Sequence, residues 1–166
     1  MSRIQLALNV DDLEESVAFY STLFGVEPAK TKPGYANFAV AEPPLKLVLV
    51  ENPGRGGTVN HLGVEVADTD TVDAEQNRLH AAGFASVDER ATTCCYAKQD
   101  KFWVENAPNG ERWEVYTVLA DSDTFNASQA VGGDEAGGST CCGSSAESVP
   151  ESVSGPASEP AAAGCC

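Results

Sequence analysis

The sequence predicts an α+β fold in which two βαβββ modules pair their sheets into one cup-like curved sheet around a metal site, followed by a disordered C-terminal tail. Three observations predict this. The pattern of apolar runs and turns in residues 1–57 repeats in residues 58–120, each half opens with a strand that carries one polar residue at the same place, and the composition changes near residue 120. We expect one domain over 1–120, built from modules 1–57 and 58–120, and a flexible acidic tail over 121–166.

The first module starts with residues 4–10, whose alternation of apolar and polar side chains is typical of a half-buried strand. Asp11 and Asp12 then suit the start of a helix. Apolar residues at helical spacing continue to Gly25, which is expected to end the helix. Three further strands, separated by proline and glycine, are expected over 27–31, 35–40 and 45–51.

The second module repeats this order, beginning with an alternating strand over 61–66. Asp68 marks a helix start, a helix is expected over 72–82, and Gly83 ends it. Asn109-Gly110 predicts a hairpin turn between the last two strands. The later strands of this module are expected over 87–91, 102–105 and 111–118.

Three polar residues on these strands are candidate metal ligands: Gln5, His61 and Glu114. Each lies among apolar strand residues, where a buried polar or charged group needs a partner. Strands that open and close the modules bring their inward faces together, and ligands from separate rigid strands suit a metal site. An imidazole, a carboxylate and an amide oxygen resemble the triad that leaves positions open on Fe(II). The alternative is that His61 is an ordinary polar residue and that Glu114 faces solvent.

The six cysteines form three adjacent pairs: Cys94-Cys95, Cys141-Cys142 and Cys165-Cys166. Neighbouring Cα atoms lie about 3.8 Å apart, which is too close for an unstrained disulfide, so we expect thiol pairs that bind a soft atom through two sulfurs. Residues around Cys94-Cys95 are typical of a loop over 92–100, so we expect exposed, reactive thiols there. The alternatives are two small buried hydrophobic residues in a strand and, for the two tail pairs, incidental cysteines.

The composition of the chain limits which classes of binding partner are expected. A formal net charge of −15 and a pI of about 4.3 disfavour nucleic acid and anionic membrane surfaces. No stretch is long and apolar enough to span a bilayer, and the first residues lack the pattern of a signal peptide. We therefore expect a cytoplasmic protein with reduced thiols and a small-molecule substrate, either a monomer or a homodimer.

Residues 3–118 resemble the vicinal oxygen chelate superfamily, which contains glyoxalases, extradiol dioxygenases and bleomycin-resistance proteins. The segments that carry the resemblance are QLALNVDDL from Gln5, SVAFY from Ser16, HLGV from His61 and WEVY from Trp113. The resemblance implies metal ligands at the positions of Gln5, His61 and Glu114.

Within this superfamily the chain is most similar to the organoarsenical carbon–arsenic lyases, also known as the cadmium-induced protein family. The similarity lies in KPGYANF over 32–38, NHLG over 60–63 and TCCYA over 93–97. It implies an Fe(II)- and O2-dependent enzyme that breaks the C–As bond of trivalent organoarsenicals and gives arsenite. In this hypothesis Cys94 and Cys95 bind As(III), and the loop that carries them closes over the cup. Tyr96 or Lys98 then supplies a proton or holds an oxygen, a choice that the sequence leaves open.

The sequence departs in two places from the ligand patterns of other enzymes in this superfamily, which limits the alternative functions. Extradiol dioxygenases have histidine where this chain has Gln5, and an amide is the weaker ligand. Glyoxalases can have glutamine there but need a fourth, acidic ligand late in the first module, where the strand over 45–51 has no acid before Glu51. The rival functions are sequestration of As(III), Cd(II) or a drug by a resistance protein, and extradiol cleavage of a catechol. The second rival gives Cys94-Cys95 no function.

Overall fold

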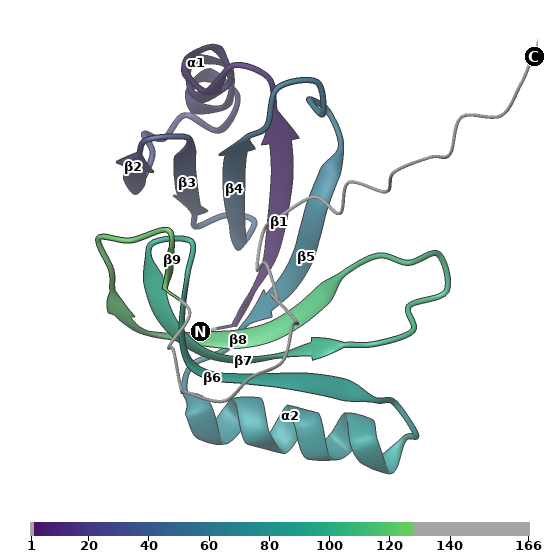
Figure 1. The fold of residues 1–166 in the computed structure, drawn as a ribbon. Helices are drawn as coiled ribbons and strands as arrows, with labels where there is room; N and C mark the ends of the chain where they lie inside the picture. Colours follow the sequence, from purple (N-terminus) through teal and green to yellow (C-terminus); the bar gives the residue numbers. More distant parts are fainter. Residues whose placement is uncertain (1, 128–166) are drawn as a thin grey trace, which may run out of the picture.

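The computed structural model describes residues 2–127 of the chain (Figure 1). Its elements confirm the predicted α+β class and the two βαβββ modules. In chain order they are β1 (Arg3–Val10), α1 (Leu13–Phe24), β2 (Lys30–Lys32), β3 (Tyr35–Val40), β4 (Leu45–Glu51), β5 (Val59–Glu65), α2 (Thr69–Ala81), β6 (Ser86–Cys94), β7 (Ala97–Val104), β8 (Trp113–Asp121) and β9 (Asn126–Ala127).

The strands of this described part form one sheet in the order β2-β3-β4-β1-β5-β8-β7-β6-β9. The modules meet where β1 pairs with β5 in antiparallel orientation. On either side, β1 pairs in parallel with β4, and β5 pairs in parallel with β8. Each module therefore has the same strand order when read outward from the junction. Figure 1 shows how strongly the sheet curves, with α2 along the outer side of β6, β7 and β8.

Alternating side chains give the sheet two different faces. On β1, Leu6, Leu8 and Val10 belong to an apolar cluster with residues of α1, whereas Gln5 and Ala7 face the concave side. The second module buries α2 in the same way, through a cluster of Val66, Val72, Phe102 and Val115. The helices thus cover the outer face, and the concave face keeps the polar residues.

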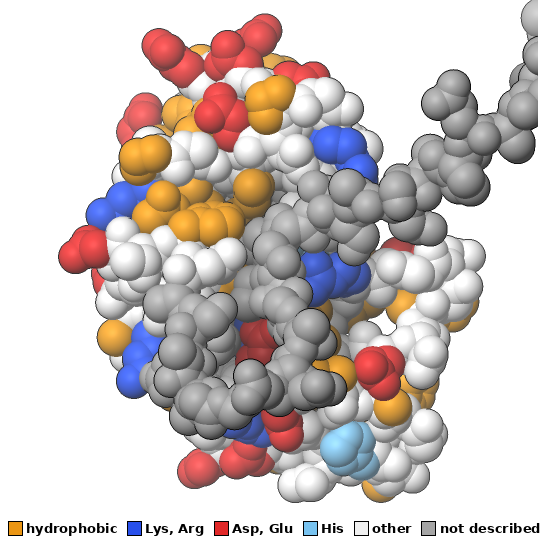
Figure 2. Space-filling model, in the orientation of Figure 1, with side chains coloured by type: hydrophobic (Ala, Val, Ile, Leu, Met, Phe, Trp, Pro, Cys, Tyr) orange, Lys and Arg blue, Asp and Glu red, His pale blue; other side chains and the backbone are white. Residues whose placement is uncertain are grey.

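Local signals explain where the helices begin and end. The Asp12 side chain accepts a hydrogen bond from the Glu15 N–H, and Gly25 ends α1 with a φ of 66°. Asp68 caps α2 in the same way through the Thr71 N–H, so α2 starts at Thr69, earlier than the predicted residue 72. Acidic side chains gather at the two ends of the molecule that the helices occupy (Figure 2).

Strand register brings two candidate ligands together. Gln5 is opposite Gly63 on β5, and Gly63 is in turn opposite Glu114 on β8. A Cβ atom at Gly63 would lie 3.2 Å from the Glu114 side chain and 3.3 Å from the Gln5 side chain. The glycine therefore leaves the space in which these two side chains meet. His61 is opposite Ala7, two residues further along the same pair of strands.

The prediction of a loop over 92–100 is wrong. Residues up to Cys94 extend β6, β7 begins at Ala97, and Cys95 and Tyr96 form the tight turn between them with φ of 55° and 60°. A turn with two positive φ values normally carries asparagine or glycine, and because neither residue stands here the turn could not be predicted. Two other strand predictions also differ: β2 covers only Lys30–Lys32, and Asn109-Gly110 lies within a longer connection between β7 and β8.

The sheet continues past the expected end of the domain at residue 120. β8 runs to Asp121, β9 pairs with the end of β6, and Phe125 packs against Tyr35 and Tyr96. The rest of the expected tail, with Cys141-Cys142 and Cys165-Cys166, lies outside the described residues. Neither helix between residues 2 and 127 is long and apolar enough to cross a membrane.

Candidate active site

The three predicted ligands meet on the concave face at the junction of the two modules. Gln5 Nε2 lies 2.9 Å from His61 Nε2 and 2.9 Å from Glu114 Oε1, and the last two atoms are 3.4 Å apart. All three side chains are at most 4 % exposed. The structure therefore brings together three polar side chains from β1, β5 and β8 in a buried position, which excludes the solvent-facing alternative for Glu114.

His61 is held in one tautomer by its neighbours. Its Nδ1 lies 2.7 Å from the Asn60 side-chain oxygen, and the Asn60 amide nitrogen donates to Asn9 Oδ1 at 2.8 Å. Because the Asn60 oxygen only accepts, Nδ1 carries the proton and Nε2 keeps a free lone pair. That lone pair points toward Gln5 and Glu114, which is the orientation that metal-binding histidines need. Asn60 had no predicted role.

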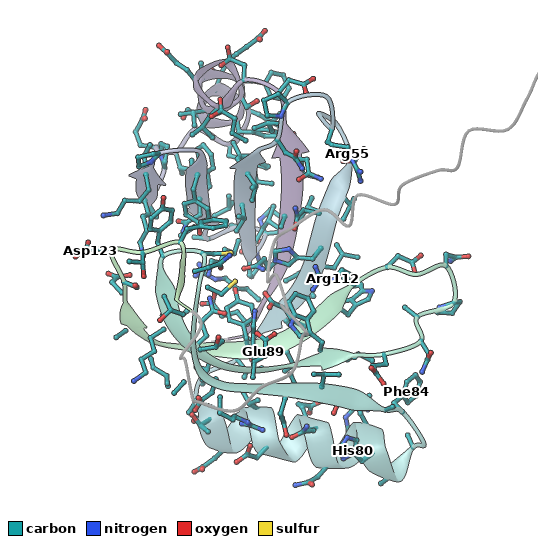
Figure 3. All side chains as sticks on the ribbon, in the orientation of Figure 1. Arg55, His80, Phe84, Glu89, Arg112 and Asp123 are labelled. Carbon is teal, nitrogen blue, oxygen red and sulfur yellow. The ribbon has the colours of Figure 1, made fainter. Side chains whose placement is uncertain are left out.

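Glu114 is paired with a buried lysine that the sequence analysis missed. Lys101 Nζ lies 3.0 Å from Glu114 Oε2 and 3.4 Å from Glu89, which is labelled in Figure 3 over the strands of the second module. Burial acts to raise the pKa of Glu114, but the Lys101 ammonium outweighs it and lowers that pKa to about 2. Glu114 is therefore a carboxylate at neutral pH. Lys98, the predicted proton donor on the same strand, is exposed.

Trp103 is a second missed residue of the site. Its ring meets the His61 ring edge to face, with centroids 5.7 Å apart. The Lys101 ammonium lies 4.6 Å from the centroid of the indole, and the Arg112 guanidinium, labelled in Figure 3, lies 4.3 Å from it. Residues 101 and 103 share one face of β7, so the period of two in this strand was the available signal. Trp103 restricts the movement of the His61 ring.

These residues fit a divalent metal ion. Ligand atoms lie about 2.0–2.2 Å from such an ion, so two ligands of one ion are at most about 4.4 Å apart, and all three pairs of site atoms satisfy this. Histidine, cysteine, aspartate and glutamate alone form no group of three in residues 2–127 that could hold a metal, so the amide of Gln5 is required. It must present its oxygen, although Nε2 faces the other two ligands here.

The first module supplies no fourth ligand at the position that matches Glu114. Gln5 corresponds to His61 in the repeat, and Ala7 therefore corresponds to Gly63. Because Ala7 pairs with Val48 as Gly63 pairs with Glu114, Val48 is the counterpart of Glu114. Val48 is apolar and buried. The arrangement thus offers a metal ion three protein side chains and no fourth one from this position of the first module.

The thiol pair lies at the turn between β6 and β7. The sulfur atoms of Cys94 and Cys95 are 3.3 Å apart, too far for a disulfide and close enough for one atom to contact both. Cys94 is only 2 % exposed, so the prediction of two exposed thiols is wrong for this residue. Cys95, which is half-buried, keeps partial access to solvent.

An apolar wall connects the thiols with the candidate metal ligands. Cys95 and Phe125 pack against a cluster made of Ala7, Tyr35, Val48, Val50 and Tyr96. Ala7 is the residue opposite His61, so this cluster reaches the ligand set. Tyr96, the other predicted proton donor, gives its hydroxyl proton to the backbone oxygen of Pro33 at 3.1 Å and contributes its ring to the wall.

Comparison with known proteins agrees with this architecture. The family model described as the Glyoxalase/Bleomycin resistance protein/Dioxygenase superfamily matches residues 3–115. Two solved structures show the same fold at low identity: the Mn(II)-bound glyoxalase from Novosphingobium aromaticivorans (TM-score 0.53, 20 % identity, 78 % of this chain and 44 % of that one) and an extradiol ring-cleaving dioxygenase from B. fuscum (TM-score 0.52, 19 % identity, 73 % and 34 %).

Relatives found by sequence share a much higher sequence identity with this chain than these two structures do. The chain is 70 % identical over 125 residues to the cadmium-induced protein CadI of Mycobacterium tuberculosis, which covers 75 % of this chain and 82 % of that protein. It is 60 % identical over 126 residues to a trivalent organoarsenical cleaving enzyme of Thermomonospora curvata (75 % and 83 %). A further enzyme of that name from a Bacillus species is 40 % identical over 153 residues (89 % and 94 %). The chain therefore belongs to the Glyoxalase/Bleomycin resistance protein/Dioxygenase superfamily.

Proposed function

We propose that this protein cleaves the C–As bond of trivalent methyl- or aryl-arsenicals and releases inorganic arsenite, in a reaction that depends on Fe(II) and O2. The observation that carries the proposal is the pair of thiols 3.3 Å apart on an apolar wall that leads to Gln5, His61 and Glu114. The names of the relatives from Thermomonospora curvata and Bacillus support the substrate class. The proposal also needs reduced thiols, in agreement with the cytoplasmic location expected from the sequence.

The thiols hold the substrate. Sulfur–metal bonds are about 2.3 Å long, so one soft atom reaches both Cys94 Sγ and Cys95 Sγ at their present separation. A trivalent arsenical with two hydroxyl groups forms two S–As bonds, and the two thiol protons leave with those hydroxyls as water. The organic group stays on arsenic, and the aromatic rings of Tyr35, Tyr96 and Phe125 exclude water from it.

Gln5 Oε1, His61 Nε2 and Glu114 Oε1 are the atoms that would hold the iron. When bound there, Fe(II) would supply the activation of O2. Lys101 keeps Glu114 ionised and fixes its second oxygen, and Asn60 keeps the His61 lone pair available. Neither predicted proton donor faces the ligands, because Lys98 is exposed and the Tyr96 hydroxyl donates to the Pro33 backbone oxygen. Lys101, whose ammonium group lies 3.0 Å from Glu114, replaces them as the candidate proton donor.

Sequestration is the second candidate, because two vicinal thiols suffice to retain As(III) or Cd(II). The name of the cadmium-induced relative fits that function as well. Such a protein needs neither iron nor oxygen. Catechol cleavage ranks third, since it leaves Cys94 and Cys95 without a function.

Two variants separate the substrate site from the metal site. We expect Cys95→Ser to retain iron but to lose arsenite release by at least about 100-fold, because one sulfur no longer holds the arsenic. We expect Glu114→Ala to retain the arsenical but lose iron, and Cys141→Ser, in another adjacent pair, to release arsenite like the wild type. Bound iron, bound arsenical and released arsenite are each quantified. Full activity of Cys95→Ser would refute the two-sulfur site, and retention without arsenite in the wild type would favour sequestration.

A further inference from the structure

A buried phenol connects the Gln5 amide to a carboxylate outside the ligand set. The Tyr116 hydroxyl lies 2.6 Å from Gln5 Oε1 and 2.8 Å from Glu65 Oε2. Tyr116 is fully buried, follows Glu114 by two residues on the same face of β8, and pairs with Glu65 of β5 in the strand register. Nothing in the mechanism above uses these two residues.

The phenol has one proton for two oxygen neighbours, so only one of them accepts it. Glu65 is the stronger acceptor, because it is a carboxylate kept ionised by Lys46 at 3.2 Å and Arg3 at 2.9 Å, whereas the Gln5 amide is neutral. Burial acts to raise the pKa of Glu65, but Lys46 and the hydrogen bonds from Tyr116 and Arg3 outweigh it and lower the pKa. An ionised carboxylate donates nothing, so the Tyr116 proton goes to Glu65.

The remaining partner of the phenol oxygen must then be a donor. On Gln5 only Nε2 can donate, and a half turn of the amide exchanges Nε2 and Oε1 without changing its shape. With Nε2 toward Tyr116, Oε1 faces His61 Nε2 and Glu114 Oε1. Three acceptors then converge, an arrangement that a bound cation stabilises. In the structure Nε2 lies 2.9 Å from both of these atoms, so holding a cation requires the half turn.

We propose that Tyr116 is a positioning residue that selects the oxygen of Gln5 as metal ligand, and that Glu65 sets the direction of its proton. This inference rests on the proposed metal site. Metal binding is accompanied by a half turn of the Gln5 amide, and the chain from Glu65 through Tyr116 makes the oxygen-inward orientation the favourable one.

The test measures metal affinity in the full-length protein by anaerobic titration with Co(II), followed by its visible absorption and by calorimetry. We expect Tyr116→Phe to weaken binding by about 10- to 100-fold, the usual effect of losing a group that orients a ligand. Glu65→Gln should act in the same direction, because an amide at this position can donate to Tyr116 and release the phenol proton toward Gln5 Oε1. Tyr20→Phe, which removes a hydroxyl on α1, is the control and should bind like the wild type.

A second background distinguishes orientation from general support. In Gln5→Glu both terminal atoms are oxygens, so there is no face to select, and adding Tyr116→Phe should change Co(II) affinity by less than about threefold. An equal loss in both backgrounds, or no loss in either, would overturn the inference while leaving the metal site in place. A wild type that binds no divalent metal would overturn the site and the proposed function together. Thermal unfolding of each variant checks the fold, and Glu65→Gln replaces Tyr116→Phe if the latter does not fold.

Discussion

The charged side chains of the site are buried, and each is stabilised by an opposite charge nearby. Lys101 is completely buried, yet it lies within 3.4 Å of both Glu89 and Glu114. The positions of Gln5 and His61 were predictable because the module repeat places them on corresponding strands, and that of Glu114 because a carboxylate among bulky strand residues needs a partner. Lys101 was not predictable, because a lysine in a strand normally faces solvent, and Tyr116 was not predictable either. Their roles depend on the pairing of strands that are distant in the sequence.

Removing Lys101 should therefore destabilise the folded protein. Lys101→Met leaves two carboxylates in a buried site without their cation, and such a loss typically costs about 3–5 kcal/mol. Lys98→Met, on the same strand but exposed, should change the free energy of unfolding by less than about 0.5 kcal/mol. Urea unfolding of both variants at neutral pH makes the comparison. Equal stability of the two variants would show that the Lys101 pairing adds nothing.

The element of most functional interest is the hairpin of β6 and β7. Cys95 and Tyr96 occupy the left-handed region at its turn, where residues other than glycine and asparagine are strained. The turn was not predictable because it lacks the residues that normally form one, whereas both helices, with standard caps at Asp12 and Asp68, were predicted closely. A strained turn that carries both thiols is consistent with selection for binding rather than for stability.

The strain predicts a stability change when Cys95 is replaced. Cys95→Asn should be more stable than Cys95→Ala by about 1 kcal/mol, because asparagine tolerates the left-handed conformation. Both variants should fail to retain a trivalent arsenical through two sulfurs. Thermal melting and arsenical binding test this pair. A Cys95→Asn variant no more stable than Cys95→Ala would show that the turn is not strained.

For the whole molecule, the module repeat predicted the sheet, but the end of the domain depends on contacts that composition does not reveal. Residues 121–127 look like the tail that follows them. Asp121 nevertheless pairs with Lys30, and the Phe125 ring lies 6.3 Å from that of Tyr35. These contacts join the end of the second module to the outer strands of the first, across the concave face.

Two truncations test this boundary. A chain that ends at residue 127 should keep the stability of the full-length protein. A chain that ends at residue 120 should lose about 1–3 kcal/mol, mainly from the burial of Phe125, since the exposed ion pairs of Asp121 and Asp123 contribute little. Chemical unfolding of the two chains measures the difference. Equal stabilities would place the end of the domain at residue 120, as the composition suggests.

Release of arsenite in a controlled atmosphere tests the central claim most directly. The full-length protein is loaded with Fe(II) without oxygen, given a trivalent phenylarsenical, and sampled before and after air is admitted. We predict stoichiometric binding of the arsenical before air, and inorganic arsenite only after air and only with iron present. An arsenical that stays intact on the protein after air is admitted would contradict C–As cleavage and leave sequestration by Cys94 and Cys95 as the function.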